Sequence, residues 1–495
     1  MMQNNRNSLI PVEWTGLQND RRGRFLRIAR VLACVAIVLA VIVPAVQLQV
    51  IHVRNYYSDE HKDYKGAQAR WSTAARSMWR GNNIYIHSEE ALELKKAGKV
   101  KNGEKLVSFH PNMPFTVILL SAFAYLPWWL GPALFTLLKL VVIFSSFLAA
   151  ASVCRHDDRK MPDWVVALGI TWGILMIISD IQHANLNCFA LGAILLHLWL
   201  YRKGKDTAAG AALALAICLK MTPVLFVLYW LYQRNWRLLG GCISAGIVMG
   251  IAIPAVLLGP GYYMELAGTW MNNLVLKNAA GSWYPMHTNQ SWLGVVSRYF
   301  IGEPHWAGNI FFDPEAGAAI DKYWITVVDL GPGPARFLVT GGQLAIAATI
   351  AWAIGLKKLA RDDGRRGVHY GMILTGMMLL NQRTWDHHAA VMLPAFFAGW
   401  YAIGFARFSS LGRKILLATM VASGLMLWLS AGELLQVYAG MLGFTDKDRG
   451  ADIILAYGPR FYFFITTLAV LIFIAVSTRK SLAPYAEERQ TLKKI

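Results

Sequence analysis

Charged residues and cysteines are both scarce in this 495-residue sequence. Charged residues make up 16% of it, whereas a soluble globular protein uses roughly 25%. The five cysteines lie in or at the ends of apolar runs and lack the close spacing of a metal-binding or redox motif. The sequence therefore argues against a soluble domain, and also against a scaffold held together by disulfides or by a cysteine-bound metal.

Apolar runs take the place of the missing charge. Hydrophobic residues make up 56% of the chain, and the mean hydropathy is +0.38. A membrane-spanning helix needs ~20 consecutive apolar residues. Runs near that length lie at 29–50, 131–153, 163–180, 184–201, 238–258, 336–356, 368–380, 389–406, 415–436 and 458–477. The sequence thus predicts an all-α, polytopic integral membrane protein.

Basic residues gather in the short loops between these runs, and the net charge is +19. They include Arg155 and Arg159, Arg202 and Lys203, and the stretch 357–366. An excess of Lys and Arg in short loops is typical of the cytoplasmic side of a membrane protein. The charge therefore indicates orientation in a membrane, and no nucleic-acid partner is expected.

Two apolar segments, 113–128 and 207–232, have two interpretations. If every basic short loop is cytoplasmic, 113–128 does not cross the membrane, and 207–232 goes out and back as two short helices with its turn at Lys220–Pro223. If 113–128 does cross, 207–232 is a single kinked span, and the loops at Arg155 and Arg202 lie outside. We favour the first interpretation. Either one gives about 12 transmembrane helices with both termini inside.

One transmembrane domain, residues 29–477, is expected between a cytoplasmic N-terminal segment, 1–28, and a cytoplasmic C-terminal tail, 478–495. Two large extracytoplasmic loops are expected at 51–112 and 259–335. In the first loop, apolar residues recur at helical spacing between Asp63 and Arg80. That pattern suits a helix lying on the membrane surface.

Nearly all unusual polar clusters fall on the predicted extracytoplasmic side. They are residues 58–64, 109–111, 182–187, Lys220, 287–291 and 381–388. Polar groups at membrane depth are costly and tend to be functional. Their concentration on one side indicates an outward-facing active site. The main rival from another class, a transporter or flippase of lipid-linked glycans, predicts polar residues on both sides and matching halves of the chain.

The order of these motifs resembles that of the GT-C membrane glycosyltransferases, specifically glycosyltransferase family 87, which includes polyprenyl-phosphate-mannose-dependent α-mannosyltransferases. The similar segments are Asp63-Tyr64 with Gly81 and Tyr85, Phe109-His110-Pro111, Asn185 to Asn187, Ala209-Gly210 to Pro223, Asn289-Gln290-Ser291 and Trp385-Asp386-His387-His388. The resemblance covers residues 29–400 and implies a GT-C fold. The chain departs from the family pattern at His110, where the family has Pro, and it lacks a Gly-Gln pair before its asparagines.

The resemblance also implies roles for single residues. It selects Asp63 as the catalytic carboxylate, which would take the proton of the acceptor hydroxyl as that hydroxyl attacks the sugar; Asp59 and Glu60 are alternatives. Cations and imidazoles on the outer side are suited to the donor phosphate: Lys220, Arg383, His387 and His388. The candidates for substrate binding are His110, Asn185, Asn187, Asn289, Gln290 and Trp385.

The expected activity is that of an inverting glycosyltransferase, which moves a sugar from a polyprenyl-phosphate donor to an extracytoplasmic lipid or glycan acceptor. Mannose is the favoured sugar, and an arabinofuranosyltransferase or glycan ligase of similar fold is the rival within the enzyme class. The expected location is a bacterial-type cytoplasmic (inner) membrane. No metal or other cofactor is expected, because the segment from Ile181 to Asn187 offers amides and a histidine rather than the carboxylates that Mg²⁺ prefers. The alternative is a site for a softer metal formed by His183, Asp386 and His387.

Overall fold

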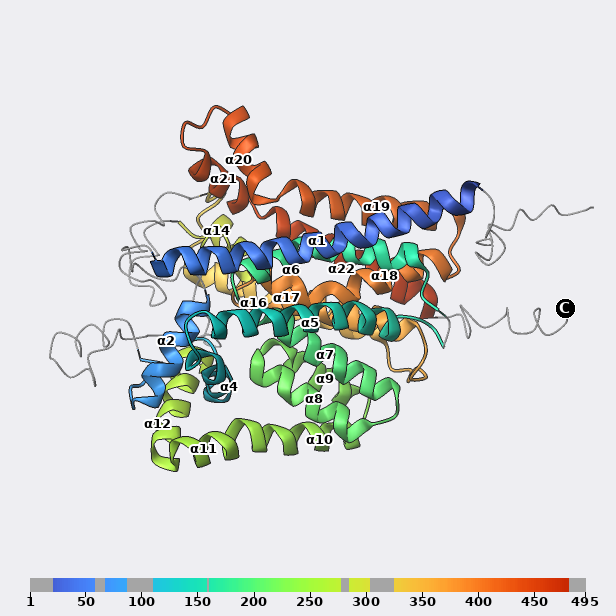
Figure 1. The fold of residues 1–495 in the computed structure, drawn as a ribbon. Coiled ribbons are helices and arrows are strands. Elements are labelled where there is room, and N and C mark those ends of the chain that lie inside the picture. The colour runs from blue at the N-terminus through green and yellow to red at the C-terminus, as the bar shows by residue number, and fades with distance from the viewer. Residues whose placement is uncertain are drawn as a thin grey trace, which may run out of the picture.

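The computed structural model describes residues 21–57, 67–86, 110–157, 160–276, 285–302 and 325–479. Within these ranges every regular element is a helix. The predicted all-α class is therefore confirmed. Several elements are shorter than a membrane span and lie at one end of the molecule, where they surround the candidate site (Figure 1).

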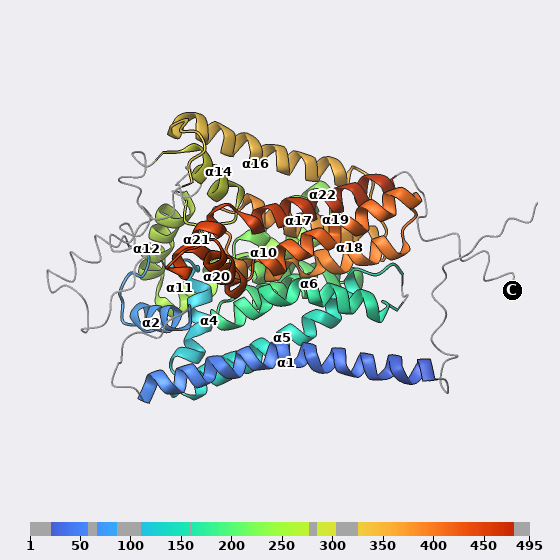
Figure 2. The same cartoon turned by 90° about the horizontal axis from the view of Figure 1, so that it is seen from above.

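Long helices run side by side through the molecule in both views (Figures 1 and 2). They are α1 (Arg21–Tyr57), α5 (Leu130–Val153), α6 (Asp163–Gln182), α7 (Asn187–Arg202), α10 (Trp236–Ile247) with η4 (Val248–Ala252) and α11 (Ile253–Leu258), α16 (Pro332–Ile354), α17 (Arg365–Leu380), α18 (Leu393–Phe405), α19 (Ser410–Leu429) and α22 (Pro459–Arg479). Among the described residues, eight helical segments are long and apolar enough to cross a membrane. The protein is therefore a multi-pass membrane protein; the number of twelve crossings stays a prediction.

The bundle has a buried centre and an apolar exterior. Helices α17, α18 and α22 pack together, and almost every side chain of α17 and α18 is buried. Peripheral helices instead leave large apolar side chains uncovered, such as Val256 of α11 at 81% exposure and Phe337 of α16 at 80%. Lipid is as apolar as these side chains, so the exterior suits a bilayer.

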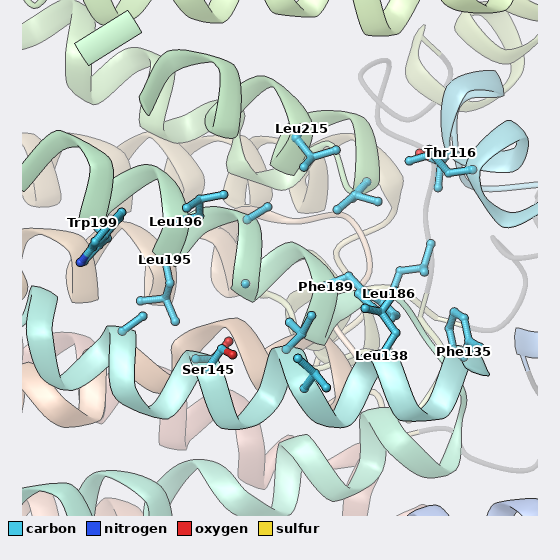
Figure 3. Close-up of a pocket in the computed structure, with 18 of the residues that line it drawn as sticks. Thr116, Phe135, Leu138, Ser145, Leu186, Phe189, Leu195, Leu196, Trp199 and Leu215 are labelled. Atoms are coloured by element: carbon cyan, nitrogen blue, oxygen red, sulfur yellow. The ribbon is translucent and has the colours of Figure 1, made fainter. Parts of the chain in front are cut away.

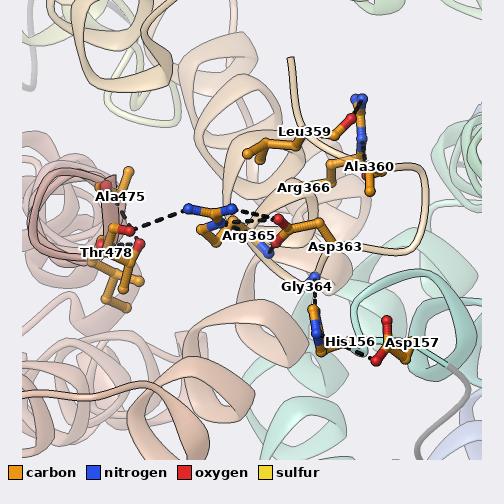
Figure 4. A network of polar contacts seen from close by, with 11 residues as sticks. His156, Asp157, Leu359, Ala360, Asp363, Gly364, Arg365, Arg366, Ala475 and Thr478 are labelled. Atoms are coloured by element: carbon orange, nitrogen blue, oxygen red, sulfur yellow. Dashed lines mark hydrogen bonds and ion pairs between the residues drawn. The ribbon is translucent and has the colours of Figure 1, made fainter. Parts of the chain in front are cut away.

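A polar network joins the basic loops at one end of the bundle (Figure 4). The Arg202 guanidinium donates to the carbonyl of Arg155 at 2.9 Å, and the Arg361 guanidinium donates to Asp206 at 2.9 Å. Arg365 pairs with Asp363 at 2.6 Å. The loops that contain Arg155, Arg202 and 357–366 therefore lie at the same end, as the favoured interpretation predicts.

Residues 207–232 follow the out-and-back path. Helix α8 (Asp206–Leu219) leaves the basic end, η3 (Thr222–Val224) makes the turn, and α9 (Leu225–Tyr232) returns. Near the end of α9, the Tyr229 hydroxyl accepts a hydrogen bond from Arg366 at 3.1 Å, which places this end beside the basic loops. The single kinked span is therefore wrong, and Lys220 lies at the opposite end from the basic network.

That opposite end contains a second packed cluster, built around α2 (Ala67–Trp79) and α4 (Pro114–Ala124). Trp71, Ala74 and Met78 of α2 are buried, as their helical spacing predicts, and α4 is one of the elements that cover them. Because protein covers this apolar face, the prediction that it rests on the membrane surface is wrong. The remaining elements at this end are α12 (Pro260–Trp270), η5 (Met271–Leu276), α14 (Trp292–Phe300), α20 (Gly432–Met441) and α21 (Lys447–Ala456).

Candidate active site

A buried ion pair lies beneath the polar residues at this end. The Lys139 ammonium on α5 donates to Asp180 Oδ2 at 3.0 Å and to the Asp180 carbonyl at 2.9 Å. It also donates to the carbonyl of Asn185 at 2.6 Å. Both side chains are almost completely buried, at 2% and 0% exposure. Sequence analysis assigned Lys139 no role, because its partner is 41 residues away along the chain.

Asp180 also closes the turn between α6 and α7. Its Oδ1 accepts hydrogen bonds from the side-chain amide of Asn187 at 2.8 Å and from the backbone N–H of Asn187 at 3.2 Å. Its Oδ2 accepts from the backbone N–H of Cys188 at 3.3 Å. These N–H groups begin α7, and a carboxylate at a helix N-terminus is favourable. The predicted substrate residues Asn185 and Asn187 therefore lie within this turn, with Asn187 buried.

The α6–α7 turn carries His183 against the segment that contains the paired histidines. The His183 ring stacks on the His387 ring, with centroids 4.8 Å apart and planes 30° apart. His387 belongs to η8 (Asp386–Met392), and its ring meets the ring of His388 edge-on at 4.6 Å. The Trp385 ring lies parallel to His388 at 6.0 Å. The structure thus brings together three predicted site residues and His183, which was not among the residues predicted to bind substrate or phosphate.

Two cations complete the cluster. Lys220 at the α8–η3 turn is half-buried, and its charge acts on both His387 and His388. Arg383 precedes η8, and its charge acts on His388. Among the described residues, no hydrogen-bond or ion-pair partner holds the Lys220 ammonium. Lys220, Arg383, His387 and His388 therefore form one electropositive group, as predicted for a site that binds phosphate.

Asn289 and Gln290 lie beside this group, but protein backbone occupies their side-chain amides. Asn289 donates to the carbonyl of Gln382 and accepts from the N–H of Thr384, both at 2.9 Å. Gln290 donates to the carbonyls of His287 and Leu455 at 2.7 and 3.0 Å. These contacts fasten the segment before α14 to the loop that carries Arg383 and Trp385. A role in shaping the site is visible; direct substrate contact stays a prediction.

Two buried arginines anchor the same loops and were not predicted. The Arg298 guanidinium of α14 donates to the carbonyls of Met286 and Asn289, at 2.7 and 2.9 Å. Arg460 of α22 forms an ion pair with Asp386, which begins η8. Neither residue stands in a recognisable motif, so only the fold reveals them. Their contacts hold residues 285–291 and 385–388 in place from behind.

His110 does not join the cationic group. It is 1% exposed within the α2–α4 cluster, where its ring meets the Tyr85 ring at 6.4 Å. Burial lowers the pKa of the His110 imidazole to about 4, against the opposing effect of a backbone hydrogen bond at Asn112; the charge of Arg70 lowers it further. His110 is therefore neutral near pH 7, and it contacts protein rather than an open surface.

The acidic candidates Asp63, Asp59 and Glu60 lie outside the described residues. The nearest described residue on the C-terminal side is Ala67, at the start of α2. Helix α2 packs on α4 and lies at this end of the bundle (Figure 1). The assignment of Asp63 as the catalytic base stays a prediction.

An apolar cavity of about 720 Å³ opens between α4, α5, α7 and α8 (Figure 3). Its walls are almost entirely hydrocarbon, with Leu138 of α5, Phe189 and Leu196 of α7 and Leu215 of α8 among the lining residues. Ser145 and Trp199 line it farther along α5 and α7. At its other end lie Thr116 and Leu219, and Leu219 directly precedes Lys220. One end of the cavity therefore lies at the residue before Lys220.

Comparison with known proteins decides the family. The sequence model of glycosyltransferase family 87 matches residues 109–366, which is just over half of the chain. The chain belongs to glycosyltransferase family 87. The protein is therefore a membrane glycosyltransferase, as predicted. No curated protein matches the chain in sequence.

Among solved structures, the family 87 chain resembles ArnT from Cupriavidus metallidurans in the apo state. The sequence identity is 14%, the TM-score is 0.32, and the match covers 83% of this chain and 72% of that one. This score is too low to support any detail of the site. The family match itself covers His110, the Lys139–Asp180 pair and Lys220, and it ends before Arg383.

The described part of this family 87 member contains no group of three or more His, Cys, Asp or Glu side chains placed to hold a metal ion. Asp180 and Asp386 are carboxylates beside the cationic group; Lys139, Asn187 and Cys188 occupy the oxygens of Asp180, and Arg460 pairs with Asp386. What the described cluster offers chemically is positive charge and imidazole nitrogen. These groups suit an anionic ligand such as a phosphate.

Proposed function

We propose that this glycosyltransferase takes its sugar, mannose, from a polyprenyl-phosphate donor in the bilayer and transfers it to an extracytoplasmic lipid or glycan acceptor with inversion. The cavity beside Lys220 is the observation that carries this proposal. A hydrocarbon-lined channel next to an unpaired cation matches a ligand with an apolar chain and an anionic head. A water-soluble nucleotide sugar has no apolar chain to occupy the hydrocarbon-lined cavity.

The proposed step breaks the bond between the anomeric carbon and the phosphate oxygen and forms a new bond to the acceptor oxygen. The acceptor hydroxyl gives its proton to the Asp63 carboxylate, and the sugar inverts because attack and departure lie in line. The bonding electrons leave with the polyprenyl phosphate. Lys220 and Arg383 stabilise the charge on that leaving group, and a site shielded from water strengthens their effect.

We further propose that the reaction needs no divalent metal. Lys220 and Arg383 supply positive charge, and hydrogen bonds within the protein already occupy the Asp180 carboxylate. Transfer is expected to continue in excess chelator. Activity that chelator abolishes and Mn²⁺ or Mg²⁺ restores would overturn this part of the proposal.

We propose that the site lies on the extracytoplasmic face of a bacterial-type cytoplasmic membrane. The reason is that the basic loops, which favour the cytoplasm, lie at the other end of the bundle. The partners are then the polyprenyl-phosphate sugar, the acceptor and membrane lipids.

A bulky residue inside the cavity tests whether the donor chain lies there. Ser145→Trp on α5 would occupy the cavity, since Ser145 lines it and is exposed toward it. The matched control is Ile243→Trp on α10, a side chain 63% exposed that does not line the cavity. The KM for a long-chain donor is expected to rise at least ~10-fold in Ser145→Trp only, because few atoms of the chain still fit.

A donor analogue with a two-isoprene chain provides the internal reference. It is too short to reach Ser145, so both variants are expected to use it as well as the unmodified protein does. Equal use of long and short donors by Ser145→Trp would show that the chain does not lie in this cavity.

A further inference from the structure

The Lys139–Asp180 pair is buried despite the cost of removing its charges from water, and its contacts show what the pair stabilises. Removing two charges from water is expensive, and well-packed apolar side chains often stabilise a core equally well. Both groups are nonetheless fully buried in an apolar bundle. The hydrogen bonds of both side chains all involve residues at the α6–α7 turn. The pair therefore fixes the geometry of this turn.

The turn needs such fixing because its backbone is unusual. Ala184 has φ of 48°, in the left-handed region that a side chain with Cβ disfavours. Lys139 bonds the carbonyl of Asn185, the next residue, and Asp180 bonds the first N–H groups of α7 beyond it. The carbonyl of Asp180 also accepts the N–H of Asn185 at 3.1 Å. Both sides of the strained residue are thus tied to the ion pair.

His183 directly precedes that strained residue, and its tautomer is defined. Its Nδ1 lies 2.8 Å from the carbonyl oxygen of Ser179, which can only accept a hydrogen bond, so Nδ1 carries the proton. The ring is exposed, and Nε2 is left to accept a hydrogen bond, such as one from a sugar hydroxyl. The ring then stacks on His387, whose own Nε2 is buried without a hydrogen-bond partner among the described residues.

We infer that Asp180, held by Lys139, is a positioning residue that fixes the α6–α7 turn so that His183 stacks on His387 and becomes a further contact for the phosphate-bearing head of the donor. This rests on the proposed function, because it takes the ligand of the cationic group to be a lipid-linked phosphate. Lys220 lies close enough for its charge to act on His387, and Asp180 acts on Lys220 in turn. The phosphate of the donor would then meet the Lys220 ammonium, and a hydroxyl of its sugar would donate to His183 Nε2.

A double-mutant cycle separates positioning from general stability. Asp180→Asn keeps the size and some hydrogen bonds of the side chain but removes the ion pair, and His183→Ala removes the proposed contact. Full-length protein in lipid nanodiscs is measured for donor KM and kcat. Each single variant is expected to raise the donor KM at least ~10-fold, since misplacement of about 1 Å can reduce activity as much as ~10²-fold. The double variant is expected to be no worse than His183→Ala alone.

The control for this cycle is Asp206→Asn, which breaks the ion pair with Arg361 at the other end of the bundle. Its effect and that of His183→Ala should multiply. Multiplying effects for Asp180→Asn and His183→Ala would overturn the inference, because Asp180 would then act independently of His183. If Asp180→Asn does not fold, as judged by thermal unfolding, Lys139→Gln takes its place. The same non-multiplying pattern is expected.

The two proposals fail in different ways. Binding of the intact polyprenyl-phosphate sugar in the absence of acceptor provides the same cycle through Kd, with no turnover needed. An unmodified protein that transfers sugar only from a donor without a lipid chain contradicts the proposed function. Normal use of a lipid-linked donor with no coupling between Asp180 and His183 contradicts only the positioning role.

Discussion

Lys220 illustrates how single residues shape the outer end of this protein. Its ammonium is half-buried at a turn between two short apolar helices, and no described residue pairs with it. Membrane depth disfavours an unpaired charge, so such residues are selected for a ligand or a partner. Its neighbours Arg383, His387 and His388 add positive or neutral groups but no carboxylate. We propose that the donor phosphate supplies the anion for this group, and that Asp63 supplies the base.

Asp63→Asn tests the proposed base. The substitution keeps the size of the side chain but removes its ability to take the acceptor proton, so the transfer rate should fall at least ~10²-fold. Donor binding should change little, because the phosphate contacts are elsewhere. Initial rates and donor Kd are measured side by side, with Asp59→Asn as the matched control. A normal rate in Asp63→Asn together with loss in Asp59→Asn would move the role to Asp59.

His110 gives a prediction about pH. Burial lowers its pKa to about 4 in the folded protein, whereas an unfolded histidine titrates near 6.5. The unfolded state therefore binds the proton more readily. As a result, the contribution of His110 to the free energy of unfolding is greatest above about pH 6.5 and decreases as the pH falls toward 4. At pH 5 the loss is about 2 kcal/mol. Between pH 7 and pH 5 the free energy of unfolding should fall by about 2 kcal/mol less in His110→Gln than in the unmodified protein; an equal fall in both would contradict it.

At the scale of elements, small residues let α8 and α10 approach closely. A Cβ on Gly210 of α8 would lie 2.1 Å from the carbonyl oxygen of Leu238, and one on Gly241 of α10 would lie 2.4 Å from that of Thr207. Contacts between helices through small residues are typical of membrane proteins, where close backbone approach replaces the hydrophobic effect. This contact stabilises the hairpin of α8 and α9, whose turn places Lys220 at the site.

Gly210→Ala should therefore separate the two helices. The added Cβ meets backbone atoms that cannot rotate away, so the free energy of unfolding should fall by about 1–3 kcal/mol. The matched control is Gly240→Ala, one residue away on α10, where a Cβ meets nothing within 4 Å. That variant should be as stable as the unmodified protein or slightly more so. Equal thermal stability of the two variants would mean that α8 and α10 are not in this close contact.

The sequence predicts most helices, because the length of each apolar run and the position of each basic loop can be read from neighbouring residues. The buried face of α2 and the hairpin at 207–232 are examples. Contacts between distant segments gave no such signal: Lys139 with Asp180, Arg460 with Asp386 and His183 with His387 each join residues that no spacing rule connects. Asn289 and Gln290 were recognised by motif, but only the fold shows their amides bonded to backbone. The surface-helix prediction failed because α4, far along the chain, covers α2.

At the scale of the whole molecule, two polar ends face opposite sides of an apolar bundle. One end is a network of paired Arg and Asp residues, and the other is the cationic group with the cavity beside it. The paired charges at one end serve structure and orientation, whereas Lys220 at the other end has no ion-pair partner among the described residues. This asymmetry suits an enzyme that works on one face of a membrane.

The orientation can be measured by labelling. A cysteine at Gly204, in the α7–α8 loop, should be shielded from an impermeant external thiol reagent, while one at Ser282 should react. Ser282 lies outside the described residues but within the long outer loop of the predicted topology. The exposed Cys34 is first replaced by Ser. Labelling at Gly204 but not at Ser282 would place the site on the cytoplasmic face.

Transfer from a defined lipid donor is the most direct test of the proposed function. Purified protein in nanodiscs is given a panel of polyprenyl-phosphate sugars, with nucleotide sugars as the comparison, and both transfer and donor hydrolysis are followed. We expect sugar release from a polyprenyl-phosphate donor, fastest with mannose, and none from a nucleotide sugar. Turnover of nucleotide sugars with no turnover of any polyprenyl-phosphate sugar would contradict it.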